Sequence, residues 1–158
     1  MIKAFASDLD GTLLNDAGEI SEFSANAIKK AQKRGMLWIT VTGRSKKTAF
    51  PILQKAGING SFILLNGAEF RNGSGDLILN EEILPDKVMQ IVNHLEREGL
   101  SYELNTSIGD FATDTEFCAS AERIRPVTEL ISQRCQFRKI FVFSQGMRRL
   151  GGVKKITV

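Results

Sequence analysis

The stretch "AFASDLDGTLL", residues 4–14, places two carboxylates at the end of an apolar run, and a glycine follows them at once. Side chains two residues apart in an extended segment point to the same side, so Asp8 and Asp10 are expected to face one site. Two carboxylates this close either share a proton or hold a cation, and Mg²⁺ is the natural guest for such oxygen ligands. The competing interpretation is a simple turn, because Asp-Gly is a common turn sequence.

Two further apolar runs of strand length, residues 36–41 and 61–66, follow a first run at residues 2–7. Amphipathic segments separate the three runs, and the second segment contains Pro51, which is expected to delay or kink its helix. Three apolar strands separated by two helices predict an α/β fold with a parallel sheet of buried strands.

Polar or glycine residues follow each of the three predicted strands. Because ligands bind beyond the carboxyl ends of the strands in open α/β sheets, these residues are expected to converge on one crevice. The set comprises Asp8, Asp10, Thr42, Gly43, Arg44, Asn66 and Gly67.

The pattern changes after residue 66. Residues 68–83 predict a β-hairpin. The segments that follow predict a helix, two antiparallel strands, a helical segment over residues 115–135 with a break at Arg125-Pro126, and a last strand at 139–144. Asp110 and Asp114 fall in the second antiparallel strand, where solvated positions are expected and a role in substrate selection is the alternative. We therefore expect two domains, residues 1–81 and 82–158.

Composition limits the range of partners. The 158 residues carry a net charge of +3 and 42% hydrophobic residues, the ordinary balance of a globular protein. A basic run at residues 29–34 has no interleaved aromatic residues, so a solvated helix face is expected rather than a nucleic-acid site. We also expect no membrane association, because no apolar run is long enough to span a bilayer. Cys118 and Cys135 match no metal spacing, and two reduced thiols fit a cytoplasmic location.

Three motifs carry a resemblance to a known family. "DLDGTLL" resembles the first motif, D-x-D-x-T, of the haloacid dehalogenase (HAD) superfamily, and "VTGR" resembles its second motif. "NGA" after the third strand is similar to the Asn-Gly segment of the Cof-type phosphatases, the type IIB members with an α+β cap. The resemblance implies a Rossmann-like parallel sheet, residues 1–81, followed by a partial cap, residues 82–158.

The resemblance also implies a function, Mg²⁺-dependent hydrolysis of small phosphorylated metabolites through an aspartyl-phosphate. Asp8 would be the nucleophile and a metal ligand. Asp10 would be the general acid and base, and its backbone carbonyl would bind Mg²⁺. The phosphate or the rest of the substrate would contact five residues, namely Thr42, Gly43, Arg44, Asn66 and Gly67.

The sequence departs from the family pattern after residue 80. No Gly-Asp-x-x-x-Asp segment follows, and Lys154 or Lys155 could be nominated for the lysine of the third motif only within the predicted cap. We therefore expect a chain that ends within the cap and an incomplete catalytic site. The first strand would be an exposed apolar edge, which favours self-association.

Two other functions compete with phosphatase activity. The first is a non-catalytic remnant that binds phosphate or self-associates. The second is a receiver-like domain, which ranks last because receivers carry their phosphoacceptor on a later strand than the acidic pair.

Overall fold

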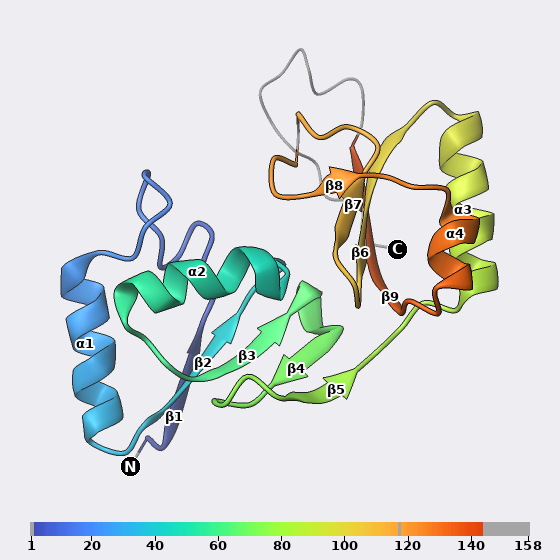
Figure 1. The fold of residues 1–158 in the computed structure, drawn as a ribbon. Coiled ribbons are helices and arrows are strands. Elements are labelled where there is room, and N and C mark those ends of the chain that lie inside the picture. Colours follow the sequence, from blue (N-terminus) through green and yellow to red (C-terminus); the bar gives the residue numbers. More distant parts are fainter. Residues whose placement is uncertain (1, 117, 144–158) are drawn as a thin grey trace. The chain divides into compact units, whose positions relative to one another are not determined.

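The structure is a computed structural model that describes residues 2–116 and 118–143. The chain divides into two compact units, Met1–Glu81 and Glu82–Val158 (Figure 1). The two lysines considered for the third motif, Lys154 and Lys155, lie outside the described residues.

The first unit contains one five-stranded sheet with strand order β1-β2-β3-β4-β5. The first three strands are parallel, and the last two form the predicted antiparallel hairpin. The elements in chain order are β1 (Ala4–Ser7), α1 (Glu22–Lys33), β2 (Leu37–Val41), α2 (Lys46–Ala56), β3 (Ser61–Leu64), η1 (Leu65–Gly67), β4 (Glu69–Arg71) and β5 (Leu77–Asn80). This is the predicted α/β architecture, and α2 begins at Lys46 and runs through Pro51 without a late start.

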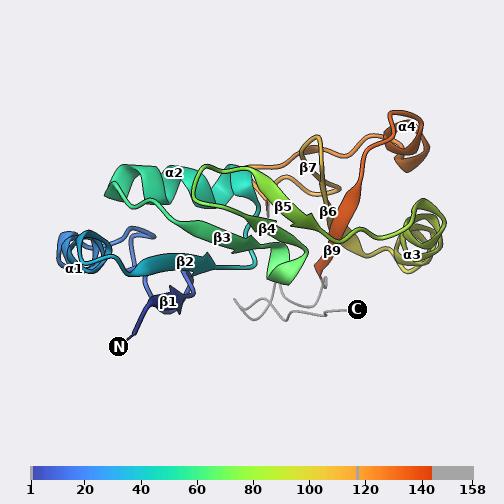
Figure 2. The same cartoon turned by 90° about the horizontal axis from the view of Figure 1, so that it is seen from below.

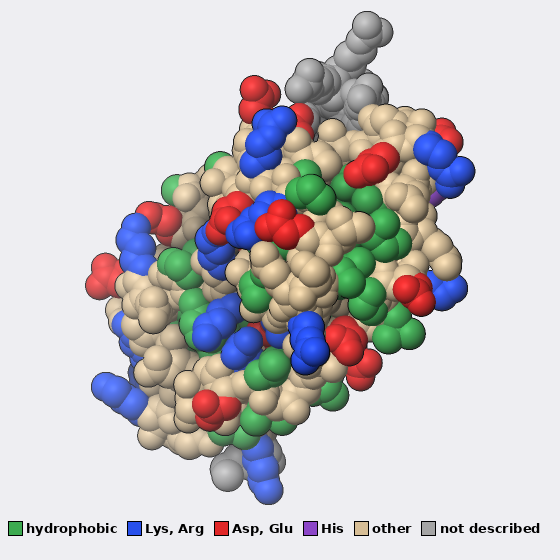
Figure 3. All heavy atoms as spheres, turned by 45° about the vertical axis from the view of Figure 1, so that its right-hand side comes forward, with side chains coloured by type: hydrophobic (Ala, Val, Ile, Leu, Met, Phe, Trp, Pro, Cys, Tyr) green, Lys and Arg blue, Asp and Glu red, His purple; other side chains and the backbone are tan. Residues whose placement is uncertain are grey.

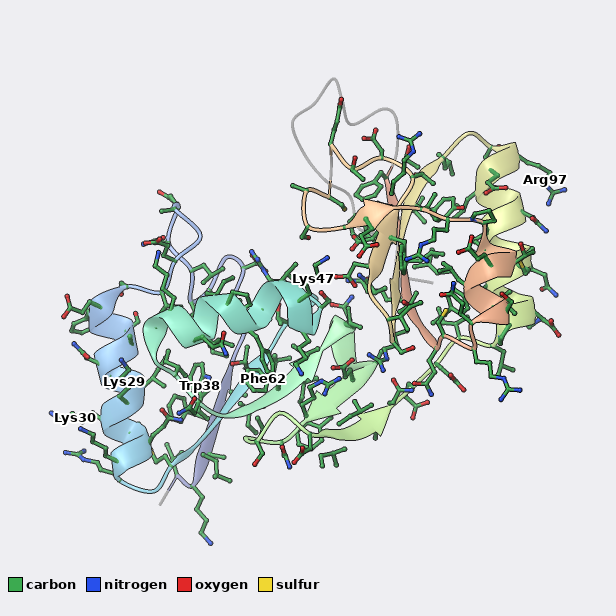
Figure 4. The ribbon with its side chains drawn as sticks, viewed as in Figure 1. Lys29, Lys30, Trp38, Lys47, Phe62 and Arg97 are labelled. Atoms are coloured by element: carbon green, nitrogen blue, oxygen red, sulfur yellow. The ribbon has the colours of Figure 1, made fainter. Side chains whose placement is uncertain are left out.

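Both helices of the first unit lie on the same side of the sheet (Figure 2). Right-handed crossovers that always step in the same direction along the sheet place their helices on one face. The core lies in that layer, where Ile28 of α1 and Leu53 of α2 pack in one cluster with strand residues. Figure 4 shows Trp38 and Phe62 on the side of the sheet that α2 covers, and both are buried.

In the described residues, the opposite face of this sheet is exposed at β1 and at the start of β2, and it is half-buried along the rest of β2 and β3. In β1 the side chains of Ala4 and Ala6 are exposed, and their neighbour Leu37 on β2 is 66% exposed. The prediction that residues 2–7 form a buried strand is therefore wrong. The reason is topological, because β1 lies at the edge of the sheet among the described strands and both helices of this unit cover the other face.

In the part of the second unit that the structure describes, there are two helices and a four-stranded sheet with order β8-β7-β6-β9. Its elements are α3 (Pro85–Arg97), β6 (Ser101–Thr106), β7 (Asp110–Ala112), β8 (Glu122–Arg123), α4 (Val127–Ser132) and β9 (Phe137–Phe143). Both predicted antiparallel strands form, and β6 also pairs with β9. The core joins α3, α4 and the sheet through buried side chains that include Val88, Leu104, Phe111 and Leu130.

The predicted helix over residues 115–135 is wrong for most of its length. Of the described residues in this range, Val127–Ser132 alone are helical, and Glu122–Arg123 forms a short strand beside β7. Pro126 is the N-cap of the helix, so the proline ends the preceding extended segment rather than interrupting a longer helix.

The described surface carries charged side chains of both signs together with exposed hydrophobic side chains, among them Phe23 and Ile78. On the face drawn in Figure 3, Lys and Arg side chains stand among Asp and Glu side chains, a distribution typical of solvated surface. Across residues 2–116 and 118–143, none of the helices has the length and apolar character needed to cross a membrane.

Candidate active site

The loops that follow β1, β2 and β3 meet through hydrogen bonds at the carboxyl ends of these strands. The backbone N–H of Asn66 donates to the Thr42 carbonyl over 3.3 Å, and that of Leu65 donates to the Arg44 carbonyl over 3.1 Å. The Arg44 side chain in turn reaches Asp10. The predicted convergence of the three strand ends is therefore present in the structure.

The loop after β1 turns tightly around a buried leucine. Leu9 is fully buried, and its carbonyl accepts hydrogen bonds from the backbone N–H groups of Thr12, Leu13 and Leu14. Its two neighbours, Asp8 and Asp10, are both exposed. Gly11 has a φ of 73°, a left-handed conformation that glycine adopts without steric cost. The apolar anchor and the glycine turn thus present both carboxylates to solvent.

Asp8 is oriented by its own loop. Its Oδ1 accepts a hydrogen bond of 2.7 Å from the Leu9 backbone N–H. Among the described residues, no donor contacts its second carboxylate oxygen. The Asp8 side chain is therefore held at one oxygen and accessible at the other.

Asp10 is held by a different group, the guanidinium of Arg44. The Arg44 Nε donates to Oδ2 over 2.8 Å, and Nη2 donates to Oδ1 over 2.6 Å. This bidentate pair raises the pKa of Arg44, because the carboxylate accepts hydrogen bonds from the charged form.

Thr42 and the start of α2 form the next part of the site. Thr42 is buried, and its Oγ1 accepts a hydrogen bond of 3.2 Å from the Arg44 backbone N–H. Lys46 and Lys47 begin α2, and no acidic residue lies in its first turn. Lysines are unfavourable at the positive end of the helix dipole, so this end favours a bound anion.

The turn after β3 adopts left-handed backbone conformations. Asn66 has a φ of 61° and Gly67 a φ of 102°, and both residues are exposed. The short helix η1 therefore presents an asparagine and a glycine beside the Thr42 loop, to which Asn66 is bonded.

The donors at this site suit Mg²⁺ better than a metal that needs a complete protein cage. Within the described part of the chain, no group of three or more His, Cys, Asp or Glu side chains is placed to hold a metal. Mg²⁺ is commonly bound by one or two carboxylates, with water and substrate phosphate supplying the other ligands. The exposed Asp8 carboxylate meets that requirement, and the Asp10 carboxylate is engaged by Arg44.

A groove of about 540 Å³ lies elsewhere in the first unit. It is formed by residues 17–20, α1 and α2, and none of the predicted site residues lines it. The groove is therefore separate from the predicted site.

The second unit holds a polar network that the sequence interpretation missed. Asn105 Nδ2 donates to Glu103 Oε1 and to Asp110 Oδ1, both over 2.9 Å, and the Cys118 thiol donates to Glu103 Oε2 over 3.2 Å. Burial and the neighbouring Glu103 raise the pKa of Cys118 to about 12. Asp110 is only 4% exposed, so its predicted solvated position is wrong. The sequence signal that could have indicated this network is the placement of Asn105 and Asp110 on either side of the predicted hairpin turn, which makes them cross-strand partners.

Comparisons with known proteins give a consistent result. The chain is 35% identical over 105 residues to the phosphatase YwpJ of Bacillus subtilis, a match covering 66% of this chain and 37% of that protein. A solved haloacid dehalogenase-like hydrolase from B. subtilis superposes with a TM-score of 0.83 and 25% identity, over 95% of this chain and 67% of that chain.

A second solved structure extends the comparison of folds. A HAD subclass IIB sugar phosphatase superposes with a TM-score of 0.73 and 21% identity, over 89% of this chain and 58% of that one. The chain thus spans little more than a third of the curated relative and up to two thirds of these structures. The family described as haloacid dehalogenase-like hydrolase matches residues 5–138, and the chain belongs to this family.

Proposed function

We propose that this protein acts in the Mg²⁺-dependent hydrolysis of small phosphorylated metabolites, through an aspartyl-phosphate on Asp8. The observation that carries the proposal is the pair of exposed carboxylates around the buried Leu9, next to the Thr42 loop and the start of α2. The relatives add support, because one is named a phosphatase and another a sugar phosphatase.

In this proposal the two aspartates divide the chemistry. An Asp8 carboxylate oxygen attacks phosphorus and the ester P–O bond breaks. Asp10, which enters this step as the protonated carboxylic acid, gives its proton to the departing alcohol oxygen and becomes a carboxylate. Water then attacks the phosphorus of the aspartyl-phosphate, Asp10 takes the proton from the water, and inorganic phosphate leaves. Asp8 is thereby regenerated as a carboxylate.

The phosphate would be bound at the end of β2. The Thr42 hydroxyl and the backbone N–H groups at the start of α2 are the proposed donors, and Gly43 permits close approach of the backbone. Lys46 and Lys47 add positive charge there. Asn66 and Gly67, which are exposed beside this loop, would contact the rest of the substrate.

The Asp8 carboxylate and the Asp10 backbone carbonyl would hold Mg²⁺. When bound, this ion would neutralise negative charge on the phosphate and on the nucleophile. Omission of the ion is expected to reduce phosphate release, which a titration with MgCl₂ after treatment with EDTA measures.

The second unit is proposed to be part of a type IIB cap. Among the described residues after 82, two helices and a sheet that is antiparallel except for the β7–β8 pair support this assignment. A cytoplasmic location stays a prediction from cysteine usage.

The proposal is tested by phosphate release from p-nitrophenyl phosphate in the presence of Mg²⁺. Asp8→Asn is expected to abolish release, because an amide is not a nucleophile for phosphorus. Asp16→Asn is the matched control, since Asp16 is an exposed aspartate in the same loop region. If wild type and Asp8→Asn are equally inactive, catalysis by this chain is excluded and the non-catalytic alternative is favoured.

A further inference from the structure

Hydrogen bonds hold both the backbone and the side chain of Arg44. Its backbone N–H donates to Thr42 Oγ1, and its carbonyl accepts from the Leu65 N–H. Its side chain then makes two parallel hydrogen bonds to the Asp10 carboxylate, of 2.8 and 2.6 Å. Bidentate pairs of this kind fix the plane of the carboxylate as well as its distance.

Stability alone does not account for this arrangement. The Arg44 and Asp10 side chains are 33% and 55% exposed. Pairs at such exposed positions contribute about 0–1 kcal/mol to folding, since water screens them and side-chain entropy is lost. The result that the pair does secure is the direction in which the Asp10 carboxylate points.

We propose that Arg44 is a positioning residue that orients the Asp10 carboxylate, instead of a direct ligand of the phosphate. This inference rests on the proposed function, in which Asp10 protonates the leaving group. Both of the Arg44 donors in the pair are directed to Asp10. The resemblance to the family implied phosphate contact for this arginine, so the two roles make different predictions.

Substrates with different leaving groups distinguish the positioning role of Arg44 from the phosphate-binding role. Alkyl phosphates release a poor leaving group, so their hydrolysis depends on a correctly placed acid, whereas p-nitrophenyl phosphate releases a good one. Positioned acid catalysis contributes roughly 10²–10⁴-fold, so partial loss of orientation is expected to lower kcat about 10- to 100-fold. If Arg44 instead bound the phosphate directly, its substitution would raise KM, and the rise would be equal for both substrates.

The experiment compares wild type, Arg44→Lys and Arg44→Gln with glycerol 2-phosphate and p-nitrophenyl phosphate. Lysine keeps the charge but loses the bidentate geometry. We expect both variants to lower kcat for glycerol 2-phosphate about 10- to 100-fold, with KM and the p-nitrophenyl phosphate reaction changed less than about threefold. Arg34→Lys is the control, because Arg34 is an exposed arginine at the end of α1. Equal losses for both substrates, or a rise in KM alone, would overturn the proposal.

A measurement without substrate separates this inference from the proposed function. In ¹⁵N NMR, the Arg44 Nε–H signal is expected to be protected from exchange in wild type and to lose that protection in Asp10→Asn. If wild type hydrolyses neither substrate, the proposed function fails and the NMR result still decides whether Arg44 holds Asp10. Equal exchange in the two proteins would refute the positioning role.

Discussion

Self-association through β1 is the prediction that follows most directly from the exposed side of the first unit. The Lys3 carbonyl accepts from the Leu37 N–H, so Lys3 faces β2. Backbone groups alternate along a strand, and the N–H and C=O groups of Ala4 and Ala6 therefore point to the open edge. Among the described strands, β1 pairs with β2 alone. Such an edge is a template for pairing with a second copy.

The size of the effect follows from these groups. Antiparallel pairing of β1 with β1 of a second copy would form about four backbone hydrogen bonds, each contributing about 1 kcal/mol net. Apolar contact by Ile2, which is 71% exposed, would add to this. Ala6→Pro removes one donor from each copy. The loss of two bonds is about 2 kcal/mol, which raises the dissociation constant about 30-fold.

Sedimentation equilibrium measures this dissociation constant directly. Proline is tolerated where the missing N–H faces outward, so Ala6→Pro is expected to retain the β1–β2 ladder. Ala6→Gly is the matched control, because it changes the same side chain but keeps the N–H donor. The reasoning is refuted if wild type remains a monomer at all concentrations, or if Ala6→Pro and Ala6→Gly associate equally.

Three further predictions concern stability and thiol chemistry. Gly60→Ala is expected to destabilise the first unit by about 1–3 kcal/mol in urea denaturation, since a Cβ there would lie 2.5 Å from the Trp38 backbone oxygen; an unchanged midpoint would contradict this. Leu104→Ala removes a fully buried side chain and is expected to cost about 2–5 kcal/mol in the second unit, and a loss below 1 kcal/mol would show that the site collapses. Because its pKa is raised to about 12, Cys118 should react slowly with iodoacetamide at pH 8 and faster as the pH rises. Glu103→Gln removes a negative charge beside the thiol, lowers its pKa and should speed alkylation, as peptide mass spectrometry would report.

The order of elements was predictable where local chemistry and tertiary structure agree. Ser21 caps α1 by accepting from the Ser24 N–H, and Gly35 follows the helix with a φ of 81°. The prediction of a helix over residues 115–124 failed for a physical reason. A short segment with helix-forming residues can still adopt an extended conformation when a neighbouring strand offers backbone hydrogen bonds. Residues 122–123 instead join the sheet as β8. The expectation of a buried first strand failed for a different reason, since an apolar run indicates a strand but not its place in the sheet; the exposed edge at this strand was expected only from the family pattern.

The sequence predicted which strand ends form the site, but it did not predict the side-chain contacts within the site. Parallel strands bring their carboxyl ends to one edge, which made the meeting of the Asp10, Thr42 and Asn66 loops foreseeable. The Arg44–Asp10 contact joins residues 34 positions apart and depends on how far one side chain reaches. Sequence spacing carries no information on that reach, so Arg44 was assigned a contact with the substrate or its phosphate and not a contact with Asp10.

The position of β1 links the fold to the chemistry proposed for it. The strand that presents Asp8 and Asp10 has four residues and, among the strands that the structure describes, pairs with β2 alone, so backbone pairing there holds it weakly. Two contacts beyond the strand compensate for this. Leu9 is buried in the core between the two aspartates, and Arg44 joins Asp10 to the loop after β2. Leu9 therefore fixes the depth of the loop, while Arg44 fixes the direction of one carboxylate. A site built on an edge strand needs both, because a change at either contact would move the two aspartates relative to Thr42.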